Sequence, residues 1–514
     1  MKRNLFRRAL ACLCLCAVLS GGLCVPARAA GFRDVPAGHW AADAISQCVT
    51  QGWFQGKSAD TFGVGQPMTR SAFAVVLSRF FGWQSSGAYY QIFSDVPQGA
   101  WYEPALRACY EHGAVTRQTG TYRPGDAVTR EELAVTLIRA LGYGPIAGLA
   151  GEDTLPFRDV TTNRGHIAMA YAMGLVSGTG QSTFAPDRAA TREQAAVMLS
   201  RLYHKLHPAG SGETILLLQG SETLPETADC TTLVLMAGTL TGGQSAQLSV
   251  TLSAAQSAAL AQKNGKTVLL GVTGQSGTLS ADTKSVARLA QAVTEGGYDG
   301  LYLDIGQPAN DNGHALGALV QRLRTAMPDK RLYVAADAPA RGQTVPDYTA
   351  LGKAADRLVL RLPAYTDSEA AVPVYAMEPP ETVYYALSIL TRQVSAEKLS
   401  LRLTAEGRCL EGNKSYAPTA DTRTAVLAQG STHYSDRSAC AYTQSGKLTL
   451  WYLNGRSLTE RQQLLRCFGA DSVCLSTGSG TLSLTAELLY LQKPRPLLSQ
   501  RARLYFLFGL IAWP

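Results

Sequence analysis

This chain of 514 residues is poor in the residue types that usually mark a metal site or a disulfide framework. It has seven histidines and eleven cysteines, and four of the cysteines lie before Val25. The other seven are scattered, odd in number and without a CxxC pair, so we expect neither a disulfide framework nor a metal site. Cys467 and Cys474 are the pair for which a close approach stays open, with two buried free thiols as the alternative.

The chain also lacks a large excess of charge. Its formal net charge is +8, but five basic residues and no acid lie within residues 1–29. These residues follow a secretion pattern, with a basic start, an apolar run and an ARA sequence before Ala30. We expect a signal peptide over residues 1–29, whose removal leaves a net charge of about +3 and argues against a nucleic-acid partner.

No apolar run reaches the roughly 20 residues that a membrane-spanning helix needs. The apolar core of the signal segment is too short, no lipobox precedes Cys24, and the run within the C-terminal tail, residues 491–514, is also too short. We therefore expect no transmembrane span in the mature chain. The tail could dock on the rest of the chain, meet another protein or lie on a membrane surface.

What the sequence does contain is an internal repeat. FRDVPAGHWAADAI (32–45), FSDVPQGAWYEPAL (93–106) and FRDVTTNRGHIAMA (157–170) share one pattern, and each is followed by a glycine-marked turn and a Thr-Arg segment. In the last segment of each repeat, apolar residues recur at helical spacing, for example at Leu133, Leu137 and Leu141. Each repeat is therefore predicted to be largely helical.

The Thr-Arg pairs predict helix starts with an unusual charge. Thr129 with Glu132, and Thr191 with Gln194, have the spacing of capping boxes. An arginine in the first turn faces the positive end of the helix dipole, at a cost of roughly 0.3–1 kcal/mol. Arginine in this position of all three repeats indicates an acidic partner, which is either an aspartate of the FxD element or an anionic ligand such as a carboxylate. The arginines are Arg70, Arg130 and Arg192, and the aspartates are Asp34, Asp95 and Asp159.

These motifs resemble three S-layer homology (SLH) repeats, over about 32–83, 93–143 and 157–206. The resemblance implies an all-α, three-lobed bundle over residues 30–206 that binds secondary cell-wall polysaccharide, often with a pyruvylated sugar, in grooves between lobes. It places groove residues at Asp34, Trp40, Arg70, Asp95, Trp101, Arg130, Asp159 and Arg192. Two departures predict unequal grooves: Ile167 stands in place of the third tryptophan, and Ser71-Ala72 replaces the acidic part of the first box.

After a linker at 207–213, short β-rich runs alternate with amphipathic helical stretches. Eight candidate strands predict an (α/β)8 barrel, with a doubly wound sheet as the alternative. The strands are TILLLQG, TTLVLMAG, KTVLLGVTG, DGLYLDIG, RLYVAADAP, DRLVLRLPAY, KLSLRLTAEG and SVCLSTG. No glycine-rich phosphate loop follows the first strand, so no nucleotide or other cofactor is expected.

The succession over residues 214–490 resembles glycoside hydrolase family 18, in the branch of spore-cortex-lytic and germination proteins. The resemblance implies that the substrate's N-acetyl group is the nucleophile, that an aspartate orients it and that a glutamate protonates the leaving oxygen. Asp304 matches the aspartate, but Gly306 stands where the glutamate belongs. RLPA at 361–364 and Ser476 replace two further elements of the sugar site.

The sequence therefore predicts a secreted bacterial cell-wall protein with a non-catalytic barrel that binds glycan or serves as a scaffold. The barrel's glycan-binding candidates are Tyr302, Asp304 and Tyr365. One alternative is a wall-anchored glycosidase that acts on peptidoglycan or a chitin-like N-acetylglucosamine polymer. It would use Asp304 with Asp337 and Glu406, whose other interpretation is a helix cap or a loop hydrogen bond. A structural S-layer component is the other alternative.

Overall fold

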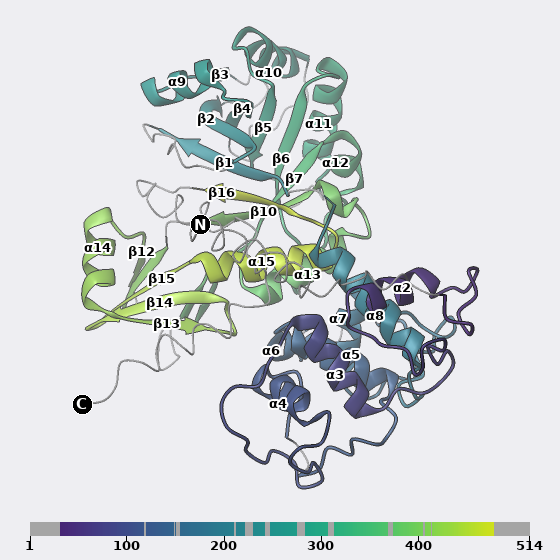
Figure 1. Ribbon diagram of the computed structural model, residues 1–514. Helices are drawn as coiled ribbons and strands as arrows, with labels where there is room; N and C mark the ends of the chain where they lie inside the picture. The colour runs from purple at the N-terminus through teal and green to yellow at the C-terminus, as the bar shows by residue number, and fades with distance from the viewer. Residues whose placement is uncertain are drawn as a thin grey trace, which may run out of the picture. The chain divides into compact units, whose positions relative to one another are not determined.

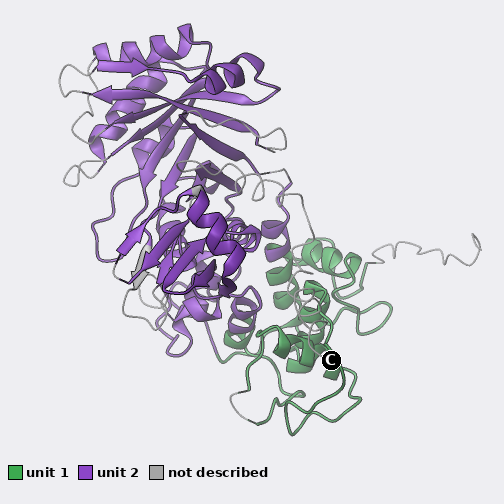
Figure 2. Ribbon diagram, turned by 90° about the vertical axis from the view of Figure 1, so that its left-hand side faces the viewer, with its two compact units in different colours: residues 1–133, 187–201 green, residues 134–186, 202–514 purple. Residues whose placement is uncertain are grey.

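The computed structural model describes residues 31–476, except for 118–119, 149, 151–154, 210–211, 221–229, 242–246, 275–282, 307–312, 368–373, 405–406 and 413. The predicted signal peptide and C-terminal tail lie outside these residues. The chain divides into two compact units, residues 1–133 with 187–201 and residues 134–186 with 202–514 (Figure 2). The element labels below are those of Figure 1.

The first unit is built from the helices of the repeats. They are α2 (Ala42–Thr50), α3 (Arg70–Phe81), α4 (Glu103–Glu111) and the first turns of α5 (Arg130–Ala140) and α8 (Arg192–Leu206). Thr69 begins α3, because its Oγ1 accepts a hydrogen bond from the Ala72 amide at 3.2 Å. Gly82 ends the helix with a φ of 65°, a left-handed conformation that glycine adopts without strain.

The three Thr-Arg segments meet in a closed ring of backbone hydrogen bonds. The Met68 amide donates to the Ala190 carbonyl at 2.9 Å, the Ala190 amide donates to Val128 at 2.9 Å, and the Val128 amide donates to Met68 at 2.8 Å. These three residues occupy the same position in their repeats, two residues before the arginine. The ring thus places the three helix starts around a common centre.

The second unit contains the remainder of α5 and α8, the short α6 (Gly144–Ala147) between repeats two and three, and α7 (Arg164–Ala172) of repeat three, and it continues into a barrel. Eight parallel strands close the barrel in the order β1-β2-β4-β5-β6-β7-β10-β16, because β1 pairs with both β2 and β16. This closure confirms the predicted barrel over the doubly wound alternative. The strands are β1 (Thr214–Gln219), β2 (Thr232–Thr241), β4 (Thr267–Gly274), β5 (Gly300–Ile305), β6 (Arg331–Asp337), β7 (Arg357–Arg361), β10 (Leu399–Thr404) and β16 (Ser472–Ser476).

Helices connect most of these strands and lie outside the barrel (Figure 1). They are α9 (Ala254–Gln262), α10 (Thr283–Glu295), α11 (His314–Ala326), α12 (Thr349–Ala354), α13 (Pro380–Leu390) and α15 (Gly455–Cys467), with a short 3₁₀ helix at Ala396–Lys398. The barrel interior is filled by inward side chains of alternate strand positions, among them Leu217, Leu269, Tyr302 and Val359, all 0% exposed. The interior is therefore a packed core, and a ligand site belongs at its end.

Small sheets border the barrel. β3 (Gln247–Val250) pairs antiparallel with β2, and β8 (Tyr365–Asp367) pairs with β9 (Val374–Ala376). A five-stranded antiparallel sheet, which was not predicted from the sequence, is inserted in the chain between β10 and β16, although these two strands pair with each other. It comprises β11 (Arg408–Glu411), β12 (Lys414–Tyr416), β13 (Ser431–Ser435), β14 (Cys440–Ser445) and β15 (Leu448–Tyr452), with α14 (Ala420–Gln429).

Candidate functional site

The arginines of the repeats contact the next repeat around the ring. Arg70 Nε donates to the Tyr122 carbonyl at 2.7 Å, and its guanidinium lies 4.9 Å from the centre of the Tyr122 ring. Its Nη1 forms an ion pair with Glu132. Glu132 Oε2 accepts from the Thr129 amide at 3.0 Å, and Thr129 Oγ1 accepts from the Glu132 amide, so the predicted capping box at Thr129 is confirmed.

Arg192 makes the corresponding contacts with repeat one. Its Nε donates to the Phe62 carbonyl at 3.0 Å, and its Nη2 donates to the Gln55 carbonyl at 2.7 Å. The guanidinium also lies 4.9 Å from the centre of the Phe62 ring. The backbone amide of Arg130 donates to the Arg188 carbonyl at 3.0 Å, so repeat two contacts repeat three in the same direction around the ring.

The three FxD aspartates bind backbone amides. Asp34 accepts from the amides of Phe62, Gly63 and Val64 at 2.7–2.9 Å. Burial alone would raise the pKa of Asp34, but these bonds outweigh it and hold the pKa below the ordinary value of 3.8. Asp95 binds the Tyr122 and Arg123 amides, and Asp159 binds the Phe184 and Ala185 amides. The aspartates thus fix the turns whose carbonyls and rings the arginines contact.

Two tryptophans of the repeats face solvent. Trp40 is 63% exposed and Trp101 is 68% exposed, and each stands two residues before a helix, α2 or α4. An exposed indole offers a flat apolar ring face to solvent. Both are therefore suited to stack on a sugar ring.

The third repeat differs from its expected alignment. Ile167 lies within α7, is 0% exposed and stands seven residues before Gly174, as Ile45 stands before Gly52. Counted from the FxD phenylalanine, α7 starts three residues earlier than α2, so Ile167 corresponds to Ile45 and not to the tryptophan, contrary to the prediction. Thr162, two residues before α7, occupies the tryptophan position.

At the carboxyl ends of the barrel strands, two arginines hold Asp304. Arg361 Nη1 lies 2.5 Å from Asp304 Oδ1, and Arg402 Nη1 lies 2.7 Å from Asp304 Oδ2. The Asp304 side chain is 11% exposed, whereas the arginines are 21% and 22% exposed. Arg361 Nε also binds Asp337, whose side chain is 58% exposed, at 2.9 Å. We call these four residues, from β5, β6, β7 and β10, the mouth cluster.

The mouth cluster changes the chemistry available to Asp304. Both carboxylate oxygens accept charge-assisted hydrogen bonds, which are about twice as strong as neutral ones. Gly306, two residues further on, provides no side chain, and its amide donates to the Gly274 carbonyl at 3.3 Å. Tyr302 lies beneath the cluster, 0% exposed, in the barrel core.

Glu378 is a buried carboxyl near the same end of the barrel. It is 7% exposed and bonds to Thr404, the last residue of β10. Burial raises the pKa of Glu378 from 4.5 to about 7, against the opposing effects of Arg461, Thr404 and Arg402. Its φ of 41° is unusual for a residue with a side chain. Sequence reasoning missed Glu378, Arg361 and Arg402 as site residues, since no motif marks them.

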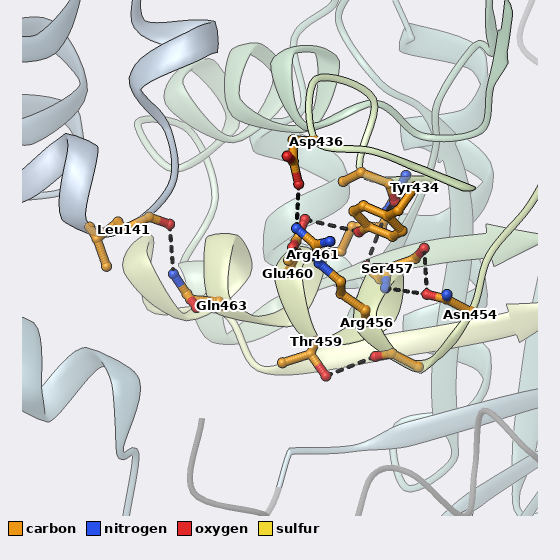
Figure 3. A network of polar contacts seen from close by, with 12 residues as sticks. Leu141, Tyr434, Asp436, Asn454, Arg456, Ser457, Thr459, Glu460, Arg461 and Gln463 are labelled. Carbon is orange, nitrogen blue, oxygen red and sulfur yellow. Dashed lines mark hydrogen bonds and ion pairs between the residues drawn. The ribbon is translucent and has the colours of Figure 1, made fainter. Parts of the chain in front are cut away.

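Arg461 of α15 joins this segment to the five-stranded sheet. It is 0% exposed and donates to the carbonyls of Glu378 at 3.0 Å and Ala439 at 2.6 Å, as well as those of Met377, Ser438 and Ser457. Beside it, Arg456 binds Glu460 at 2.8 Å and lies 3.7 Å from the centre of the Tyr434 ring (Figure 3). The helix α15 is therefore fixed to the inserted sheet by buried and half-buried cations.

Several predicted residues are not brought into the mouth cluster by the described contacts. Tyr365 lies in β8, but its side chain is outside the described part, and so is the whole of Glu406. Cys467 and Cys474 are free and buried. In the same part of the chain, no group of side chains has the composition of a metal site, and no helix is long and apolar enough to cross a membrane.

The repeats define the class of the first part of the chain. The S-layer homology domain family matches residues 31–74, 92–134 and 156–196, so the chain carries three such domains, as predicted. These domains, together with the S-layer relatives below, indicate a protein of the cell surface.

Similar curated proteins match between about a third and two fifths of this chain. An endoglucanase of Bacillus sp. (strain KSM-635) is 32% identical over 180 residues, which cover 34% of this chain and 19% of that protein. The S-layer protein sap of Bacillus anthracis is 26% identical over 205 residues, which cover 39% of this chain and 25% of that protein. This chain thus matches a quarter or less of the length of these relatives.

The barrel part has similar solved structures. A chitinase from Chromobacterium violaceum ATCC 12472 matches with a TM-score of 0.45 and 17% identity, over 55% of this chain and 100% of that chain. The spore cortex-lytic enzyme SleL of Bacillus cereus matches with a TM-score of 0.42 and 15% identity, over 55% of this chain and 74% of that chain.

Proposed function

We propose that this protein is held at the bacterial cell wall by its SLH domains, which bind secondary cell-wall polysaccharide, and that its barrel is a non-hydrolytic glycan-binding or scaffold domain. The proposal of a non-hydrolytic barrel rests on the mouth cluster: Arg361 and Arg402 bind both carboxylate oxygens of Asp304, and Gly306 supplies no acid.

Chemical reasoning supports a barrel without hydrolysis. Substrate-assisted cleavage needs a carboxylate that is free to orient the substrate's N-acetyl group and an acid that protonates the leaving oxygen. To orient the N-acetyl group, Asp304 would have to give up its bonds to two arginines. Gly306 has no side chain that could protonate the leaving oxygen. Loss of a positioned acid alone typically costs about 10²–10⁴-fold in rate.

The wall-binding half rests on the exposed surface of the repeats. Trp40 and Trp101 offer apolar ring faces to solvent, and Arg70 and Arg192 lie at the edges where one repeat meets the next. Exposed aromatic rings can stack on sugar rings, and a guanidinium can bind a carboxylate that a sugar carries.

One observation favours a second candidate, a wall-anchored glycosidase. Glu378 is a buried acid whose pKa of about 7 keeps a large share of it protonated at neutral pH, as a general acid requires. It adjoins Thr404 at the catalytic end of a barrel. Its burial argues against contact with a substrate, so this candidate ranks second.

The test uses the full mature chain with peptidoglycan fragments and chitooligosaccharides, followed by mass spectrometry of the products. We expect unchanged glycans. Shorter products that disappear in both Asp304→Ala and Glu378→Gln would overturn the non-hydrolytic proposal. In parallel, sedimentation with purified cell-wall sacculi tests anchoring: the chain should sediment with sacculi that keep their secondary polysaccharide and stay in solution with sacculi stripped of it.

A further inference from the structure

The two arginines of the mouth cluster use their hydrogen-bond donors unequally. Arg361 directs Nη1 to Asp304 and Nε to Asp337. Arg402 binds Asp304 through Nη1 alone, at 2.7 Å, and its Nε and Nη2 donate to no residue in the described part of the chain. These two nitrogens form one edge of the planar guanidinium. Such an edge can bind both oxygens of a carboxylate through two parallel hydrogen bonds.

The unused edge of Arg402 is accessible from outside the protein. Neither Nε nor Nη2 belongs to the buried polar atoms that lack a partner among the described residues, and the side chain as a whole is 22% exposed. Arg402 lies in β10, near the carboxyl ends of the barrel strands, where barrels of this kind bind their ligands. A ligand can therefore reach the two nitrogens.

The charges of the mouth cluster leave Arg402 incompletely neutralised. Asp304 is shared by two guanidinium groups, so these three side chains together carry one positive charge. Asp337 offsets this charge only at Arg361, from a side chain that is 58% exposed and therefore screened by solvent. Glu378 is close enough to act electrostatically on Arg402, but no ion pair joins the two within the described residues.

A second unused donor lies directly beneath the cluster. Tyr302 is 0% exposed, and its hydroxyl has no hydrogen-bond partner among the residues that the structure describes. The charges of Asp304 and Arg402 both act on this hydroxyl, so it lies close to them. Buried polar groups are nearly always hydrogen-bonded, and one that lacks a protein partner is expected where a ligand or solvent enters.

We infer that the mouth of the barrel binds a sugar that carries a carboxylate, and that the Nε and Nη2 edge of Arg402 holds both oxygens of this acid. One excess positive charge matches a carboxylate, whereas a phosphate monoester carries nearly two negative charges. A neutral N-acetylglucosamine residue would leave the edge of Arg402 unpaired. The inference rests on the proposed binding of glycan by the barrel and names the class of sugar that it takes.

The test titrates the full mature chain by calorimetry with two pairs of probes. One pair is N-acetylmuramic acid and its methyl ester, and the other is glucuronic acid and its methyl ester. Each ester keeps the shape of the sugar and removes its charge, and the two pairs distinguish an acid on an ether side chain from a uronic acid. A bidentate, charge-assisted contact predicts a preference of about tenfold or more for the free acid in at least one pair. Equal binding of acid and ester, or no binding, in both pairs would overturn the inference.

Two matched variants locate the preference in the barrel. Arg402→Lys keeps a cation beside Asp304 but removes the planar edge, so the preference for the acid should be lost. Arg324→Lys is the control, because Arg324 is similarly exposed, at 23%, and pairs with Asp356 on the outside of the barrel. This variant should keep the preference. An unchanged calorimetric midpoint of the barrel shows that Arg402→Lys is folded, and a preference that survives in this variant would refute the assignment to Arg402.

The hydrolysis assay separates this inference from the proposed function. Glycans that become shorter would contradict the proposed non-hydrolytic barrel, whatever sugar it prefers. Glycans that stay unchanged, together with equal binding of acid and ester, would contradict the inference alone.

Discussion

Replacement of Glu378 by glutamine should change how the stability of the barrel depends on pH. Glutamine has nearly the shape of glutamic acid and can still accept a hydrogen bond from Thr404, but it never ionises. In the wild type, burial raises the folded-state pKa of Glu378 from 4.5 to about 7. The folded state therefore binds more protons than the unfolded state between these two values, and stability falls as pH rises through this window.

The magnitude follows from the separation of the two pKa values. Each unit is worth about 1.36 kcal/mol, so the difference between 4.5 and about 7 amounts to roughly 3 kcal/mol at pH 8 and above. Most of this loss falls between pH 5 and pH 7. At pH 4 and below, wild type and Glu378→Gln should be about equally stable. At pH 8 the variant should be the more stable protein by a few kcal/mol at most.

Differential scanning calorimetry of the full chain from pH 4 to pH 8 measures the effect. Leu269→Ala, which removes a side chain that is 0% exposed in the barrel core, identifies the barrel's transition. The midpoint of that transition in wild type, relative to Glu378→Gln, should fall as pH rises and level off above pH 7. Parallel midpoints across the whole range would refute the argument, because Glu378 would then titrate alike in the folded and unfolded states.

Three further changes test the contacts that hold the sites. Asp304→Asn removes the carboxylate that Arg361 and Arg402 share and leaves Arg361 with Asp337 alone. The change should destabilise the barrel by roughly 1.5–3 kcal/mol, seen as a lower calorimetric midpoint; an unchanged midpoint would show that the ion pairs do not matter. Arg461→Met removes the hydrogen bonds to five buried carbonyls and should lower the free energy of unfolding in urea by about 3–5 kcal/mol. Hydrogen exchange around residues 438–440 should become faster; slow exchange there would contradict the role of Arg461 in fixing α15 to the inserted sheet. Gly56→Ala would place a Cβ 2.4 Å from the Ser58 carbonyl oxygen and should destabilise the repeats by about 1–3 kcal/mol, seen as a lower melting temperature. Gly125→Ala, whose Cβ would have nothing within 4 Å, should leave the melting temperature unchanged. Equal effects of the two changes would show that the clash at Gly56 relaxes.

The sequence by itself determined that SLH repeats come first in the chain and that a barrel of parallel strands follows them. Internal similarity at Asp34, Asp95 and Asp159 marked the repeats, because each aspartate binds the turn of its own repeat, 25–30 positions further along the chain. The Thr129 capping box is local, with Thr129 and Glu132 three residues apart. The eight barrel strands were identifiable because each is a short, buried β-rich run between helices.

Only the tertiary structure decided which charges meet. Asp304, Arg361 and Arg402 lie on three strands, up to 98 positions apart in the chain, and the closure of the barrel brings them to one end. The pairing of Arg70 with Glu132 likewise depends on the ring of hydrogen bonds between repeats, which no local pattern encodes. The burial that raises the pKa of Glu378 comes from packing between the segment after β9, the end of β10 and α15. Local hydrogen bonds and periodic burial depend on residues that are close together in the sequence. The electrostatics of a site depend on side chains that only the folded chain brings together.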